Sequence, residues 1–202
     1  MAPPDGWLGG YVPRRIVLGR GPEHLVTLGP MEAFPTGVAV ELTITTRRPV
    51  HGPPVMMFGA PDANGMRLGV AYPDAGKWQG GQGFPPDQQT PPNAPNVWFN
   101  GGGGGGKHYA QRLWLWPLPP EGPVTFALSW CDAGIDETTT VIDGALLRAA
   151  AREAEQLWAP LSPEEEQAII DEHWRSGRHG PPPGTGFRTQ RLTFGKPDEP
   201  PT

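Results

Sequence analysis

The pattern of apolar and polar positions predicts short strands along most of the first 130 residues. In the segment 37–46 the pattern has a period of two, with Val38, Val40, Leu42 and Ile44 on one face. Side chains alternate between the two faces of a strand, so this pattern is typical of a half-buried antiparallel strand. Further strand candidates lie at 14–20, 23–29, 54–60, 66–72 and 96–99. Turn residues at close spacing separate them, which favours an antiparallel β-sandwich or a small barrel.

The segment 108–130 predicts two more strands, joined by a proline-rich turn. In its first half Leu113 and Leu115 point to one face, and Trp114 and Trp116 to the other. A strand that is apolar on both faces should be covered on both sides. In the second half, apolar residues alternate with small ones, as in a strand that is buried on one face only.

After residue 142 the pattern becomes helical. Asp143 is a suitable N-cap, and Leu147, Ala151, Ala154 and Trp158 recur at helical spacing. A second helix should begin at Ser162, Pro163 and Glu165, which have the spacing of a capping box.

The predicted fold is therefore mainly β (α+β), with a C-terminal helical hairpin. We expect a β-sandwich domain at 1–142 and the hairpin at 143–177, packed on the sandwich through Trp158. A proline-rich tail at 178–202 would follow, with a candidate strand at 187–194.

Glycine and proline are unusually abundant, with 29 and 28 of the 202 residues. They are concentrated at 73–107, where aliphatic residues are scarce and where residues 101–106 are all glycine. Such a composition buries little apolar surface, so we expect a flexible insertion here.

The sequence "WLWPLPPEGPVTF", followed by "SW", "GIDET" and "IDGALLRAAAREAEQLW", resembles a group of β-sandwich-like actinobacterial proteins of unknown function. The resemblance covers roughly residues 100–158 and extends weakly back to about residue 11. It implies a shared fold. The group has no established activity, so the resemblance assigns no site residues.

The net charge of −5 is unevenly distributed, because residues 121–172 contain twelve acidic and only two basic side chains. This segment is unsuited to binding nucleic acid. On the second predicted helix, Glu164, Glu165 and Glu166 form an acidic surface that we interpret as a candidate contact for a protein partner. The alternative is a solvated helix surface without a partner.

Catalytic and metal-binding motifs are weak in this sequence. The run "GGGGGGKH" resembles a phosphate-binding loop at Lys107, but His108 replaces the required hydroxyl and a strand follows instead of a helix. The five histidines lack metal-ligand spacing, and the only cysteine, Cys131, excludes an internal disulfide. We therefore expect no metal and no cofactor.

Two tryptophans, Trp78 and Trp98, flank the glycine-rich segment and are candidates for ligand contact, together with Lys107 and His108. Exposed aromatic rings can stack on sugars or anchor a protein interface. The alternative is that the tryptophans only fill the core.

Three functions remain open, and a non-enzymatic interaction or structural protein is favoured. Such a protein would present mobile loops and the acidic helical surface to a protein partner. The alternatives are a small-ligand or carbohydrate-binding module that uses exposed tryptophans, and a hydrolase with dispersed catalytic residues. The hydrolase would need a pocket that joins His108, Asp132 or Glu137, of which the two acids are expected in a loop before the first helix.

No secretory signal and no apolar run of about 20 residues is visible, so we expect a cytoplasmic protein without a membrane contact. The oligomeric state is left open by the sequence.

Overall fold

The computed structural model describes residues 2–50, 65–73, 76–80 and 93–175. The chain divides into two compact units, Met1–Ala159 and Pro160–Thr202, which are described separately. The strand candidate at 54–60 and the tail at 178–202 lie outside the described residues.

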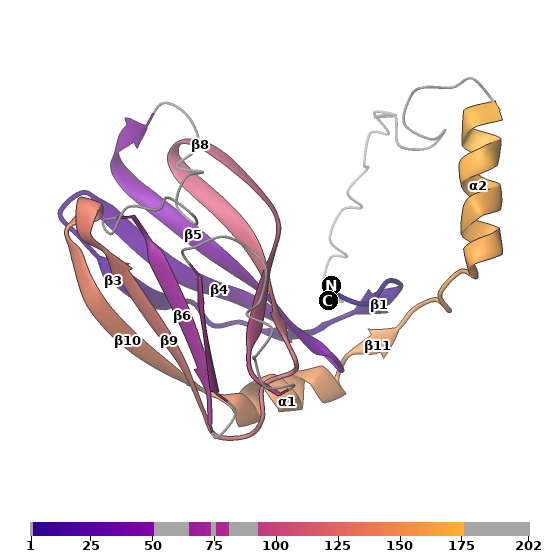
Figure 1. Ribbon diagram of the computed structural model, residues 1–202, viewed down its shortest axis with the longest axis horizontal. Coiled ribbons are helices and arrows are strands. Elements are labelled where there is room, and N and C mark those ends of the chain that lie inside the picture. The colour runs from indigo at the N-terminus through magenta and orange to yellow at the C-terminus, as the bar shows by residue number, and fades with distance from the viewer. Residues whose placement is uncertain (1, 51–64, 74–75, 81–92, 176–202) are drawn as a thin grey trace, which may run out of the picture. The chain divides into compact units, whose positions relative to one another are not determined.

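The described residues of the first unit form two large antiparallel sheets, which make two layers in Figure 1, and a small two-stranded sheet. The five-stranded sheet has the order β2-β4-β5-β8, with β3 also paired to β4. Its strands are β2 (Gly10–Val12), β3 (Ile16–Arg20), β4 (His24–Phe34), β5 (Gly37–Val50) and β8 (Asn96–Trp116). The four-stranded sheet has the order β10-β9-β6-β7. Its strands are β6 (Arg67–Tyr72), β7 (Gly76–Gly80), β9 (Pro123–Trp130) and β10 (Ile135–Asp143). The predicted mainly-β antiparallel fold is confirmed.

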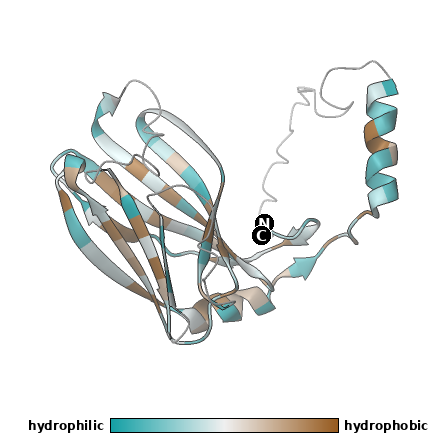
Figure 2. Cartoon of the chain, in the orientation of Figure 1, coloured by the Kyte–Doolittle hydropathy of each residue, from teal (hydrophilic) through white to brown (hydrophobic). Residues whose placement is uncertain are grey.

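The two large sheets enclose one central core of apolar side chains. The residues that contribute them alternate with polar ones along the strands and form the brown bands of the ribbon in Figure 2. The five-stranded sheet contributes Leu28, Leu42 and Leu113, each fully buried. Leu68 and Phe126 of the four-stranded sheet pack in the same cluster. Each such side chain stabilises the fold by about 1.5–3 kcal/mol through burial.

The sandwich is joined along both edges. At one edge β10 lies beside β3, where the Thr138 hydroxyl donates to the carbonyl oxygen of Leu18. At the other edge β7 lies beside β8, where the rings of Trp78 and Phe99 are 6.5 Å apart.

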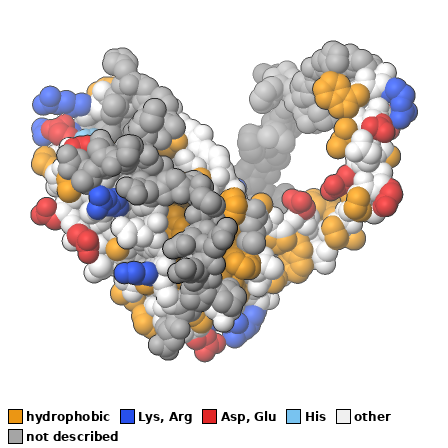
Figure 3. Space-filling view, viewed as in Figure 1, with side chains coloured by type: hydrophobic (Ala, Val, Ile, Leu, Met, Phe, Trp, Pro, Cys, Tyr) orange, Lys and Arg blue, Asp and Glu red, His pale blue; other side chains and the backbone are white. Residues whose placement is uncertain are grey.

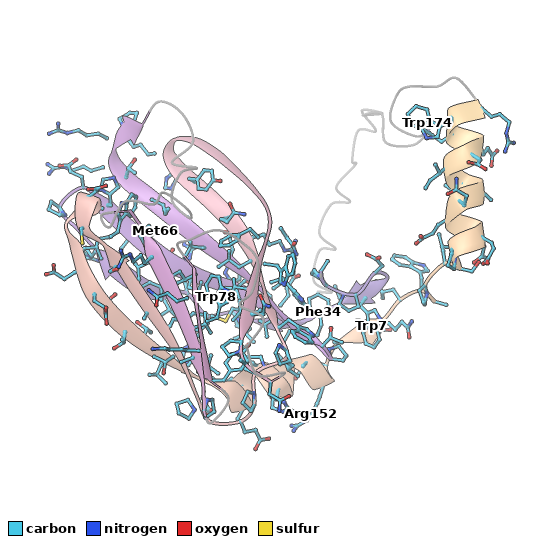
Figure 4. All side chains as sticks on the ribbon, viewed as in Figure 1. Trp7, Phe34, Met66, Trp78, Arg152 and Trp174 are labelled. Carbon is cyan, nitrogen blue, oxygen red and sulfur yellow. The ribbon has the colours of Figure 1, made fainter. Side chains whose placement is uncertain are left out.

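Strand β8 is covered on both faces, as its pattern predicted. Leu113 and Leu115 belong to the central core. Trp114, on the opposite face, is completely buried and forms a second cluster with Phe34 and Ala39. The half-buried rings of Trp7, Trp98 and Trp116 pack around this second cluster; Trp7 and Phe34 are labelled in Figure 4.

The glycine-rich segment contains strands where composition predicted an insertion. Of residues 73–107, the described parts include β7 and the first half of β8. Gly101 and Gly106 have φ angles of 74° and 62°, which side chains disfavour. Glycine thus allows β8 to double back, and the Gln111 side-chain amide donates to the carbonyl oxygen of Gly101.

Helix α1 (Gly144–Arg152) begins as predicted, because the Asp143 side chain accepts a hydrogen bond of 2.9 Å from the backbone N–H of Ala145. The helix packs on β2 and β4 through its buried face. It ends earlier than predicted, and the chain then forms β11 (Glu155–Gln156), which pairs with β1 (Trp7–Leu8). Trp158 is 69 % exposed, so the expected packing through this residue is wrong.

The second unit contains helix α2 (Pro163–Arg175). Its predicted capping box is confirmed: the backbone N–H of Ser162 donates to the Glu165 carboxylate over 2.8 Å, and the backbone N–H of Glu165 donates to the Ser162 hydroxyl over 3.2 Å. None of the 13 residues of α2 is buried. Both helices of the predicted pair therefore exist, and they belong to different units.

Candidate functional site

A shallow groove lies on the outer face of the four-stranded sheet, with a volume of about 260 Å³. Its floor consists of the small residues of β6 and β9 that point away from the core, Gly69, Ala71 and Ala127. Long polar side chains surround this floor, namely Arg67, Lys77, Gln79 and Glu137. Figure 3 shows separate basic and acidic side chains, with uncharged surface between them, over these strands.

The strand register explains why the groove is hollow. Leu68 and Val70 are buried in the core, so the alternation of β6 turns Gly69 and Ala71 outward. A Cβ added at Gly69 would lie 3.5 Å from the Cβ of Ala127, an ordinary contact. The space above the floor therefore comes from missing side chains and not from a backbone distortion.

A β-bulge in β10 brings an acid to this groove. Ile135 pairs with Trp130 and Thr138 pairs with Leu128, so both Asp136 and Glu137 stand opposite Ser129. Bulges change the direction of a side chain and are common beside binding sites. Here the extra residue places Glu137 at the groove.

The charged groups around the groove are not neutralised by one another. The ion pairs found in the described parts of the chain join Arg47 and Arg48 to Glu23, Arg112 to Glu32, and Arg152 to Glu121. Arg67, Lys77 and Glu137 thus form no ion pair with another described residue, which leaves their charges available to a ligand as far as this part of the chain is concerned.

A second, open pocket of about 310 Å³ lies where β4 begins, and Glu23, His24 and Thr46 line it together with Arg48. The His24 ring packs on Trp130 with 4.9 Å between ring centroids. Its buried Nδ1 has no hydrogen-bond partner within the described residues. Catalysis by histidine needs a nucleophile or an orienting acid within hydrogen-bond reach, and among the described residues none is hydrogen-bonded to this nitrogen.

The third feature is the exposed face of α2. Ile169, Ile170 and Trp174 are 55 %, 48 % and 65 % exposed. Glu164, Glu165 and Glu166, the partner-contact candidates from the sequence, occupy the first turn and are all exposed. Acidic and apolar side chains therefore lie close together on this helix (Figure 3).

The four ligand candidates from the sequence do not form one site. Trp78 borders the groove, but its ring packs on Phe99 and against the central core (Figure 4). Trp98 packs against the second cluster. Lys107 and His108 are exposed on β8, where His108 Nδ1 is 3.2 Å from the Thr45 hydroxyl.

The residues expected of a hydrolase are also spread over separate elements. Glu137 lines the groove, Asp132 lies in the short 3-10 helix Cys131–Ala133, and His108 lies on β8. Within the described residues, no group of three His, Cys, Asp or Glu side chains could hold a metal ion. Among the same residues, no helix is long and apolar enough to cross a membrane.

Sequence reasoning did not identify Arg67, Lys77 or Gln79 as site residues. The available signal was weak: small residues alternate with core residues in 66–72 and 123–130, with a basic residue at the start of the first segment. Comparison with protein-family models, with curated proteins and with solved structures finds no match.

Proposed function

We propose that the protein is a non-enzymatic interaction module that binds a protein partner through helix α2. The observation that carries this proposal is that α2 buries none of its residues while exposing Ile169 and Ile170. An isolated helix of this length is only marginally stable in water, and most helices gain their stability by packing an apolar face. A partner that covers these isoleucines would supply that packing.

The ends of α2 favour helix formation before binding. The reciprocal Ser162 and Glu165 hydrogen bonds satisfy backbone N–H groups at the N-terminus. Three glutamates in the first turn and Arg175 in the last turn also interact favourably with the helix dipole. Less conformational entropy is then lost on binding, which raises affinity.

The charge of α2 indicates the chemistry of the partner. The helix carries five acidic residues and one arginine. We propose a partner with an apolar groove bordered by lysine or arginine, so that the helix lies in the groove and its acids face the basic border. The proposal places the protein in the cytoplasm, where an exposed free thiol such as Cys131 stays reduced.

A carbohydrate-binding module has less support. Stacking on a sugar needs an exposed aromatic face, whereas Trp78 and Trp98 are half-buried against the two clusters.

The test uses the full chain with both isoleucines replaced, Ile169→Ala and Ile170→Ala. Alanine is the better helix former, so the helix is retained while its apolar contact is lost. Partners captured by the wild type are identified, purified and titrated against both proteins by calorimetry. We expect the double variant to bind at least roughly tenfold more weakly. Arg175→Ala, at a position about 120° or more around the helix from both isoleucines, should bind almost as wild type.

Two results would overturn the proposal. One is equal affinity of wild type and double variant for the purified partner. The other is a clear fall in the melting temperature of the unbound double variant, because that would show that the isoleucines are already covered within the same chain.

A further inference from the structure

We propose that the groove on the outer face of the four-stranded sheet binds a free α-amino acid with an acidic side chain. This inference is independent of the protein-binding role of α2. It rests on three features: the order of charged side chains across the strands, the small residues that form the floor of the groove, and the bulge that places Glu137 beside it.

The groups that would recognise the amino acid backbone lie in one row across three strands. Arg67 of β6 pairs with Ser129 of β9, and the bulge of β10 places Glu137 on the other side of Ser129. Neighbouring strands are about 4.8 Å apart, so β6 and β10 are separated by about 10 Å at this row. Two long side chains can converge over Ser129 from this distance. A guanidinium on one side and a carboxylate on the other match the α-carboxylate and the α-ammonium of an amino acid.

The opposite end of the groove carries another positive charge. Lys77 of β7 pairs with Ala71 of β6. Ala71 is four residues after Arg67, so these two positions are roughly 13 Å apart along the strand. With Arg67, Lys77 and Glu137 the groove has a net charge of +1, so a ligand with two carboxylates and one ammonium would balance it. The side-chain carboxylate would then be bound by Lys77, with Gln79 beside it on β7.

The floor and the volume fit a ligand of this size. Gly69 and Ala127 leave space between the two charged ends for the methylene groups of an amino acid side chain. Pockets for larger ligands start at about 300 Å³, and this groove is slightly smaller.

The experiment is calorimetric titration of the full chain with L-glutamate, L-glutamine and glutarate. Glutamine lacks the side-chain charge, and glutarate lacks the ammonium group. We expect saturable binding of glutamate with a Kd of about 1 mM or lower, and weaker binding of both analogues.

Three conservative variants separate the proposed contacts. Arg67→Gln and Glu137→Gln should each weaken glutamate binding by roughly tenfold or more, the loss expected for a charge-assisted hydrogen bond. Lys77→Gln should weaken the binding of glutamate but not of glutamine. Glu137→Gln should leave glutarate binding unchanged or slightly tighter, because glutarate brings no ammonium to this position.

Matched controls come from the same chain. Asp136→Asn removes the neighbouring acid of the bulge, which does not line the groove, and Arg15→Gln removes an exposed arginine outside it. Both should bind glutamate as wild type. Gly69→Leu should abolish binding by filling the floor, with circular dichroism to show that the strands are retained.

The proposal is overturned if glutamate shows no saturable binding at millimolar concentration. It is equally overturned if Asp136→Asn or Arg15→Gln weakens binding as much as the groove variants do. The Ile169→Ala, Ile170→Ala protein should bind glutamate normally, so failure of this proposal and failure of the α2 proposal can be told apart.

Discussion

The rings of Trp114 and Phe34 meet edge to face, with 5.7 Å between their centroids and 62° between their planes. They lie on the side of the five-stranded sheet that faces away from the central core, and Trp114 is completely buried there. The sandwich therefore has a second apolar cluster, which is built mainly from aromatic residues. Its stability contribution can be measured separately from that of the central core.

Replacing Trp114 with Ala should lower the free energy of unfolding by about 3–5 kcal/mol, because the surrounding residues cannot fill the cavity. Chemical denaturation measures this loss. Trp158→Ala is the matched control, since Trp158 is 69 % exposed and its loss should cost little. Similar losses for the two variants would show that the second cluster is not packed as described.

Tyr72→Phe tests the link between β6 and the start of the β8–β9 connection. The Tyr72 hydroxyl donates to the carbonyl oxygen of Pro117 over 2.9 Å. Its removal should cost about 0.5–1.5 kcal/mol at neutral pH, the usual contribution of such a bond.

The same tyrosine should make stability depend on alkaline pH. Burial raises the pKa of Tyr72 above its ordinary value of about 10. Because this pKa is higher in the folded than in the unfolded state, the protonated Tyr72 contributes fully to the free energy of unfolding below pH 10. That contribution is lost as the pH rises above 10. Denaturation curves at increasing pH should show a steeper loss for the wild type than for Tyr72→Phe. The exposed Tyr11→Phe should behave as wild type in this range.

Asp143→Ala should destabilise α1 and with it the end of the sandwich that the helix covers. The side chain caps the first turn by accepting from the backbone N–H of Ala145, and loss of an N-cap costs about 0.5–2 kcal/mol. Thermal unfolding of the full chain measures this change. Asp136→Ala is the control, because this acid is exposed and caps no helix; an equal loss there would exclude capping as the cause.

Reversing Glu164 and Glu166 to Lys tests the electrostatic part of the α2 proposal. Glu165 is kept because it completes the capping box, so the helix start is preserved. With a partner purified in the capture experiment, association should be slower than for wild type, and the difference should shrink as salt concentration rises. An unchanged association rate at low salt would mean that the acids serve only as a solvated surface.

The alternation of apolar residues was sufficient to predict most strands, because burial of one face fixes which residues point inward. Such residues lie in the central core, namely Val38, Val40, Leu42 and Ile44 of β5 and Leu113 and Leu115 of β8. The caps of both helices were equally predictable, since Asp143 and Ser162 act on backbone groups only a few residues away. Both kinds of feature depend on residues that are close together in the chain, so the sequence alone predicts them.

Strand β10 was missed because its inward residues include threonines. Thr138 and Thr140 point toward β3 and donate their hydroxyls to the carbonyl oxygens of Leu18 and Val17, so a hydrogen bond replaces the usual apolar contact. The glycines of β8 were assigned to an insertion for a similar reason. Glycine has a low strand propensity, and the contact of Gly101 with Gln111 joins residues ten positions apart, which composition does not reveal.

The groove could not be derived from any one segment of the sequence. Arg67, Lys77, Ser129 and Glu137 come from four strands, and only the register of β6, β7, β9 and β10 brings them to one surface. The bulge that places Glu137 depends on pairing with β9, which local sequence does not specify. The sequence alone therefore determined which residues fill the core and where the helices start. The tertiary structure decided which polar residues share a surface, because that depends on contacts between segments far apart in the chain.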